Sequence, residues 1–197
     1  MRHYRQGFYT AGKWLANISR VAIILTTLQW LLVGNQIPFT VGMVSVALTY
    51  VPSLLIRNRM LQTATNISVS MLLAAHVVLG MQYGLYETSA IYDKWLHVIG
   101  SGAITALVIV AVLQYCTRIR LELPVALFVI LVLGATISMG TLWEVFEFSV
   151  DRTGLFQAQR GLSDTMLDLI ADTIGVLGTL ALYLGSVSFR SLMYKTK

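Results

Sequence analysis

The chain has 197 residues, of which 56% are hydrophobic and only 12% are charged, and its net charge is +5. Soluble domains carry charge on about a quarter of their residues, so this composition excludes an ordinary soluble domain and favours a helical membrane protein. The basic residues are scattered between apolar runs, which argues against a nucleic-acid-binding surface. The single cysteine, Cys116, excludes an internal disulfide framework.

Six apolar runs are each close to the length of about 20 residues that crosses a bilayer as a helix. They cover residues 14–34, 38–56, 64–84, 93–115, 123–149 and 165–187. The runs are continuous rather than alternating, which excludes a membrane β-barrel. We therefore predict an all-α fold: a six-transmembrane-helix bundle that forms one integral membrane domain over residues 1–197.

The charges predict how these helices cross the membrane. Eleven of the 14 lysines and arginines lie in the N-terminal segment, the second and fourth connections and the C-terminus. Basic residues in short connections favour the cytoplasmic side, so we expect a protein of the inner membrane with both termini in the cytoplasm. Eight of the nine acidic residues lie toward the opposite side.

The first two runs contain no acid, and the third contains a histidine. His76 lies in "AAHVVLGMQYG", about 12 Å below the outer end of its helix at 1.5 Å per residue. A lone membrane histidine can simply form a hydrogen bond between helices, or it can serve as a metal ligand.

The fourth run begins with "YDKWLHVIGSGA", in which Asp93 and His97 are four residues apart and share one helix face. Asp93 is either a helix cap or a catalytic base. Lys94 either extends to the membrane interface or binds a substrate head group.

The fifth run ends with "GTLWEVFEFSVD", which sets Glu144 and Glu147 three residues apart. Two acids on one helix face repel each other unless something bridges them, so both are candidate metal ligands. The connection that follows contains Arg152 and Arg160. This pair is expected either to bind an anionic head group or to pair with Asp151.

The sixth run opens with "GLSDTMLDLIADTIG", which places Asp164, Asp168 and Asp172 on one helix face. Asp164 stands at the helix start, where it either caps the backbone or acts as a general base. Asp168 and Asp172 lie one and two turns further in. A central membrane aspartate costs about 3 kcal/mol on insertion scales, so these two need protonation, water in a cleft or a bound cation to compensate them.

These residues predict one polar layer in the outer half of the membrane. Carboxylates and imidazole are a normal ligand set for zinc, manganese or iron, and bundle cores build such sites from i, i+3 and i, i+4 pairs. We expect a divalent metal ion held by His76, His97, Glu144, Glu147, Asp168 and Asp172, with Asp93 and Asp164 as catalytic candidates.

Four motifs in order resemble a known family. "HVVLGMQY", "YDKWLHVIGSG", "WEVFEF" and "DTMLDLIADTIGVLG" resemble the YjdF-type family of bacterial inner-membrane proteins, over about residues 76–180. The late acid-rich helix after D-K-x-x-H is more loosely similar to VanZ-like proteins, for which Arg160 would be the basic residue before the late acids. The segment "RGLSDTM" is shorter than in the YjdF-type pattern. The resemblance implies a shared site formed by the polar residues and glycines of these motifs, namely His76, Tyr92, Asp93, His97, Gly100, Glu144, Glu147, Asp164, Asp168 and Gly175.

The resemblance implies no settled reaction, although VanZ-like members are associated with glycopeptide resistance at the cell envelope. Three functions remain open. The first is a metal-dependent hydrolase or transferase acting on a membrane lipid or a lipid-linked envelope substrate. The second is a cation- or proton-coupled transporter, and the third is a non-catalytic envelope factor in which the polar cluster only fixes helix packing.

Overall fold

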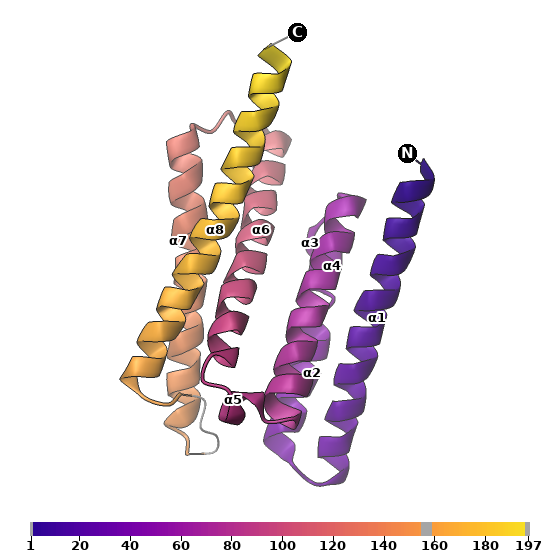
Figure 1. The fold of residues 1–197 in the computed structure, drawn as a ribbon, viewed down its shortest axis with the longest axis vertical. Helices are drawn as coiled ribbons and strands as arrows, with labels where there is room; N and C mark the ends of the chain where they lie inside the picture. Colours follow the sequence, from indigo (N-terminus) through magenta and orange to yellow (C-terminus); the bar gives the residue numbers. More distant parts are fainter. Residues whose placement is uncertain (1, 155–158, 196–197) are drawn as a thin grey trace. The chain divides into compact units, whose positions relative to one another are not determined.

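The computed structural model describes residues 2–154 and 159–195, and this part of the chain contains helices but no strand (Figure 1). The elements in chain order are α1 (Arg2–Leu32), α2 (Gln36–Leu48), α3 (Val51–Leu55), α4 (Arg59–Ala74), the π-helix η1 (Ala75–Gln82), α5 (Leu85–Thr88), α6 (Tyr92–Ile119), α7 (Val125–Asp151) and α8 (Leu162–Lys195).

Six helical segments are long and apolar enough to cross a membrane, as predicted. They are Gln6–Leu32, Gln36–Leu55, Arg59–Gln82, Tyr92–Ile119, Val125–Asp151 and Leu162–Ser186. The all-α, six-span class is therefore confirmed, while the direction in which the spans cross stays a prediction.

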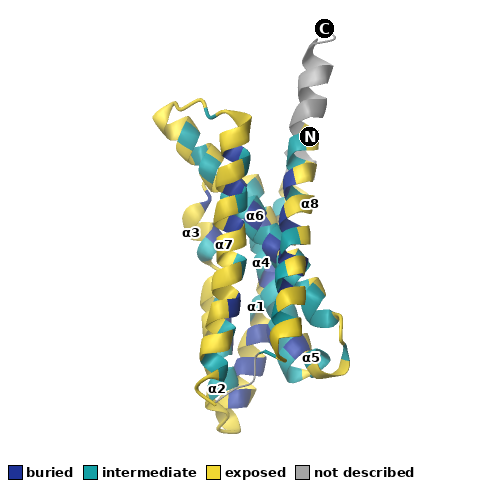
Figure 2. Cartoon of the chain, turned by 90° about the vertical axis from the view of Figure 1, so that its left-hand side faces the viewer, coloured by how far each residue is buried: buried dark blue, intermediate teal, exposed yellow. Residues whose placement is uncertain are grey.

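Large apolar side chains cover the outer faces of these helices. Leu32, Leu54 and Leu182 are 86%, 82% and 78% exposed. Soluble monomers rarely expose wide apolar patches, and a bilayer would cover these side chains. Figure 2 shows the complementary pattern on α8, where buried and exposed residues alternate around the helix.

The chain divides into two compact units, and the division falls inside α6 between Leu96 and His97. The first unit contains α1 to α5 with the first turn of α6. The second contains the rest of α6 with α7 and α8.

In the first unit α1 packs against α2 and α4, around a core that includes Ile23, Trp30 and Val77. The predicted second run is broken into α2 and α3 because Pro52 has no backbone N–H to continue the helix. The carbonyl of Thr49 at this break accepts a hydrogen bond from Arg20 Nη2 at 2.9 Å. Arg20 thus provides the Thr49 carbonyl with a hydrogen-bond donor inside a span, where an unpaired carbonyl would be costly.

In the second unit α7 packs on α8, and the core contains Ile109, Phe128, Val132 and Leu180. Four buried or half-buried polar side chains, those of His97, Glu144, Asp168 and Asp172, occur along the same three helices. His97 is 12 residues before Ile109 on α6, which corresponds to about 18 Å along the helix. The polar cluster and the apolar core therefore occupy different levels of this unit.

Candidate metal centre

The imidazole of His97 lies among three carboxylates. Its Nδ1 is 3.1 Å from Asp172 Oδ1. Its Nε2 is 3.6 Å from Asp168 Oδ1 and 4.0 Å from Glu144 Oε1. The helices α6, α7 and α8 thus bring together side chains that are up to 75 residues apart along the chain. The sequence predicted that these four residues would face one another, and the structure places them so.

The three carboxylates are buried. Glu144, Asp168 and Asp172 are 4%, 1% and 8% exposed. A single imidazole carries at most one positive charge, so it balances at most one of the three acids. Removing carboxylates from water costs several kcal/mol each unless charge or hydrogen bonds compensate them. The three acids therefore need compensation, which protonation, water or a bound cation could supply.

Glu144 provides the clearest sign of a missing partner. Its Oε2 accepts a hydrogen bond from Gln159 Nε2 at 3.3 Å, but its Oε1 is buried and has no hydrogen-bond partner. The Nε2 atom of the His97 ring is 4.0 Å from that oxygen, which is beyond hydrogen-bond range. A buried acceptor without a partner costs about 1–3 kcal/mol or more, and a cation bound beside it would remove this cost.

Gln159 was not a candidate from the sequence. Its Nε2 also donates to the Glu144 backbone carbonyl at 3.1 Å, and its own backbone N–H donates to Asp151 Oδ2 at 2.9 Å. Gln159 therefore fixes the carboxyl end of α7 and orients the Glu144 carboxylate. The only sequence signal is a polar residue in the connection between two acid-bearing helices, which is too common to single it out.

Two glycines make room for the acids and for the helix that bears His97. A Cβ on Gly140 of α7 would lie 2.5 Å from Asp172 Oδ2, so only glycine admits the carboxylate in its present position. A Cβ on Gly175 of α8 would overlap the Val98 carbonyl and the Ser101 hydroxyl of α6. The small residues thus set how closely the three helices of this unit approach.

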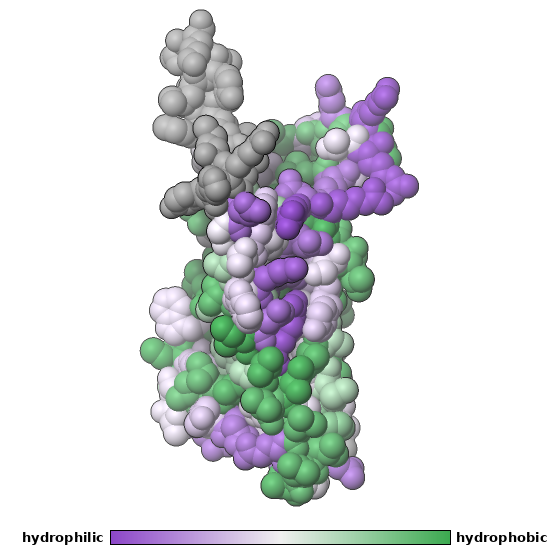
Figure 3. Space-filling view, turned by 90° about the vertical axis from the view of Figure 1, so that its right-hand side faces the viewer, coloured by the Kyte–Doolittle hydropathy of each residue, from purple (hydrophilic) through white to green (hydrophobic). Residues whose placement is uncertain are grey.

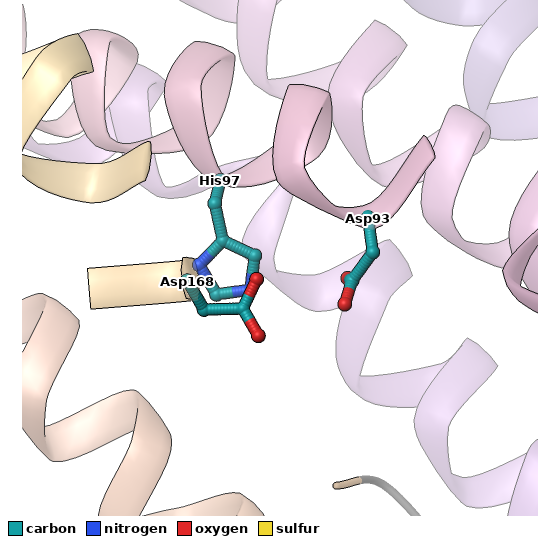
Figure 4. A group of neighbouring side chains, drawn as sticks. All are labelled: Asp93, His97 and Asp168. Atoms are coloured by element: carbon teal, nitrogen blue, oxygen red, sulfur yellow. The ribbon is translucent and has the colours of Figure 1, made fainter. Parts of the chain in front are cut away.

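Asp93 precedes His97 by one turn of the same helix. The two side chains therefore lie on the same face of α6. Figure 4 shows the Asp168 carboxylate beside the His97 ring, with Asp93 one turn away along α6. Asp93 also pairs with Lys94, whose Nζ is 3.2 Å from Asp93 Oδ2.

The remaining predicted residues lie elsewhere or have other contacts. His76 belongs to η1 in the first unit, and its Nδ1 shares a hydrogen bond with the Tyr86 hydroxyl. Glu147 is half-buried, one turn beyond Glu144. Asp164 accepts a hydrogen bond from the Arg160 backbone N–H at 3.1 Å, which is a capping contact at the start of α8.

The predicted head-group arginines are exposed. Arg152 follows the last residue of α7, and Arg160 lies two residues before the first residue of α8. The pairing of Asp151 with an arginine was an alternative prediction. Asp151 Oδ2 accepts the backbone N–H of Gln159.

Comparison with known proteins gives the chain a family. The family model described as "Predicted membrane protein (DUF2238)" matches residues 16–190, which is most of the chain. The chain belongs to this family. The match agrees with the resemblance to YjdF-type proteins, whereas a relation to VanZ-like proteins is not shown.

One relative of this chain is an uncharacterized protein of Thermotoga maritima. It is 37% identical over 112 residues, which cover 56% of this chain and 57% of the relative. The match thus spans little more than half the length of that relative. No solved structure matches the chain. The comparisons thus show a family of predicted membrane proteins.

Proposed function

We propose that this protein binds a divalent metal ion at the cluster of His97, Glu144, Asp168 and Asp172. We further propose that the ion serves hydrolysis or group transfer on a membrane lipid or a lipid-linked envelope substrate. The observation that carries the proposal is the buried Glu144 Oε1, which has no hydrogen-bond partner in a cluster with three acids and one imidazole.

The donor set fits a divalent metal. One imidazole nitrogen with carboxylate oxygens suits zinc, manganese or iron, and the residues come from facing helices as in carboxylate sites of helical bundles. His97 Nε2 faces Asp168 and Glu144, while its Nδ1 is held by Asp172 at 3.1 Å. A carboxylate on the second ring nitrogen orients a ligating histidine and makes it a better donor. Asp172 is therefore the best-placed orienting residue, and Nε2 the best-placed ligand atom.

The chemistry follows from the residues around that ion. A divalent metal would polarise a phosphate or carboxylic ester and make water a better nucleophile. Hydrolysis then needs a base for the water proton and an acid for the departing oxygen. Asp93 is the better candidate base of the two predicted, because it lies one turn from His97, whereas Asp164 is engaged in a cap. Lys94, Arg152 and Arg160 remain the candidate cations for an anionic head group.

The apolar core of the second unit favours a site over a transport path. Ile109, Phe128, Val132 and Leu180 are buried together on the helices that bear the cluster. The buried hydroxyls between these levels, Thr105 and Thr136, each donate to the carbonyl four residues earlier in their own helix at 2.7 Å. A coupled ion path requires polar groups along its length, and these two buried hydroxyls are already bonded within their own helices.

The test is metal content in detergent-purified full-length protein. We expect about one equivalent of zinc, manganese or iron by elemental analysis after extensive dialysis. Glu144→Gln should lower this content at least tenfold, because an amide oxygen is a much weaker ligand than a carboxylate. The control is Glu122→Gln, which removes an exposed acid between α6 and α7 and should retain the metal. Absence of metal from the wild-type protein, even after loading with each ion, would overturn the proposal.

A further inference from the structure

A second polar site lies in the first unit, apart from the residues of the candidate metal centre. A cavity of about 380 Å³ opens beside the N-terminal half of α1 and the first residue of α4. Its polar lining includes Lys13, Arg59, Gln6 and Asn17, and its aromatic lining includes Tyr9 and Trp14. This volume is within the range of small-molecule sites, which is roughly 300–1,000 Å³.

The charge of the cavity is positive and uncompensated. The first 86 residues contain six lysines and arginines and no aspartate or glutamate. Arg20, the nearby arginine in α1, is already bonded to Thr49 and Asn17. Lys13 and Arg59 have no acidic partner among the described residues of this unit, so the cavity is built to attract an anion.

The Arg59 guanidinium is held in position by an aromatic ring. Its Cζ lies 4.7 Å from the centre of the Tyr9 ring. Stacking on a ring leaves the N–H groups in the guanidinium plane free to bind an oxyanion, and this planar fork matches phosphate geometry. Lys13 adds a point charge, and the Gln6 side-chain amide adds a donor.

The length of α1 predicts that the cavity lies near the depth of lipid head groups. Lys13 and Leu32 are 19 residues apart on α1, which is about 28 Å and nearly the thickness of the hydrocarbon core. Leu32 ends α1, and Arg59 begins the third span. Trp14 is 66% exposed next to Lys13, as expected of an interfacial aromatic anchor. Figure 3, which views the side on which α1 lies in Figure 1, shows hydrophilic side chains gathered among hydrophobic ones.

We propose that this cavity binds the phosphate of an anionic phospholipid, with Arg59 and Lys13 as the charge-bearing contacts and Tyr9 as the support for Arg59. The end of the unit at which it lies is the one that the basic residues predict to be cytoplasmic, where membranes present anionic lipid. The inference is independent of the proposed metal-dependent function, because none of its residues belongs to the metal cluster.

Native mass spectrometry of the purified full chain tests the proposal. The protein is equilibrated with equal amounts of phosphatidylglycerol and phosphatidylcholine, and the ratio of the two retained lipids is measured. We expect wild-type protein to retain mainly phosphatidylglycerol, and Lys13→Gln/Arg59→Gln to lower the ratio roughly tenfold, since each basic group near a membrane surface contributes measurably to anionic-lipid binding.

Three further arms sharpen the result. Arg118→Gln/Arg120→Gln removes two exposed basic residues outside the cavity and should change the ratio less than twofold. Arg59→Lys keeps the charge but loses the planar fork, so an intermediate ratio is expected. Millimolar inorganic phosphate should not displace the lipid. An unchanged ratio in the cavity variant, equal loss in the control, or displacement by free phosphate would each overturn the proposal.

Discussion

At the scale of single residues, the proposed metal centre depends on which buried polar atoms have a hydrogen-bond partner. Thr105 and Thr136 satisfy their hydroxyls on their own helices, and Asp172 reaches the His97 ring. Glu144 keeps one carboxylate oxygen buried without a hydrogen bond. Since native proteins leave few buried polar atoms unpaired, this oxygen is the sharpest pointer to a bound cation in the second unit.

Gly140 tests whether the position of Asp172 matters. Gly140→Ala would place a Cβ 2.5 Å from Asp172 Oδ2 and force the carboxylate away from His97. We expect metal affinity to fall about tenfold or more, which is the usual effect of losing a residue that orients a ligand. Isothermal titration with Zn²⁺ or Mn²⁺ measures this change.

The same helix offers the matched control for that substitution. Gly134→Ala meets nothing within 4 Å of the new Cβ. It should leave metal affinity unchanged and stabilise the helix slightly, because alanine is the better helix former by up to about 1 kcal/mol. If both variants bind the metal as wild type does, Asp172 does not orient the site.

At the scale of elements, the crossing of α6 and α8 is set by Gly175. A Cβ there would overlap the Val98 carbonyl and the Ser101 hydroxyl, and a backbone carbonyl cannot move aside as a flexible side chain can. Gly175→Ala should therefore destabilise the protein by about 1–3 kcal/mol, the usual cost of overpacking. Thermal unfolding in detergent, followed by circular dichroism, measures the loss.

Gly178 is the control one turn further along α8. A Cβ added at Gly178 would have no neighbour within 4 Å, so Gly178→Ala should keep the wild-type unfolding temperature or raise it slightly. Equal destabilisation by both alanines would show that helix propensity, rather than the α6–α8 contact, governs the effect.

The helices also show which features of the fold can be predicted from the sequence and which cannot. Hydropathy and length predict six spans, because a bilayer imposes both requirements on every helix. The i, i+4 spacing likewise predicts that Asp168 and Asp172 share a face. The break before Pro52 does not end the second span. The hydrogen bond from Arg20 to the Thr49 carbonyl at this break joins residues 29 positions apart, so no local sequence pattern predicts it. Gln159 was missed for the same reason, since its partner Glu144 is 15 residues distant and no periodicity connects them.

At the scale of the whole molecule, a metal ion should act on one unit more than on the other. The four residues of the proposed metal cluster all belong to the second unit, on α6, α7 and α8. Ligand at 100 times its dissociation constant stabilises the bound state by about 2.7 kcal/mol, which slows exchange through global opening of that unit about 100-fold. Hydrogen–deuterium exchange should therefore show metal-dependent protection in these helices and little change in α1 to α4.

Glu144→Gln separates this effect from general stabilisation. The variant should show no metal-dependent protection in any helix, because it lacks the carboxylate that completes the site. Protection spread equally over α1 to α8 in the wild-type protein would contradict a site confined to the second unit.

The basic residues predict the direction in which the chain crosses the membrane, and this prediction can be tested at two exposed positions. α7 has 27 residues and spans about 40 Å, so its two ends should lie on opposite sides of the membrane. In a Cys116→Ser background, Glu122→Cys marks the connection before α7, and Arg152→Cys marks the residue after it. The positive-inside rule predicts that an impermeant maleimide labels Arg152→Cys in intact cells and Glu122→Cys only after permeabilisation. The reverse pattern would show that the chain crosses the membrane in the opposite direction. Labelling of both positions from one side would refute the span through α7.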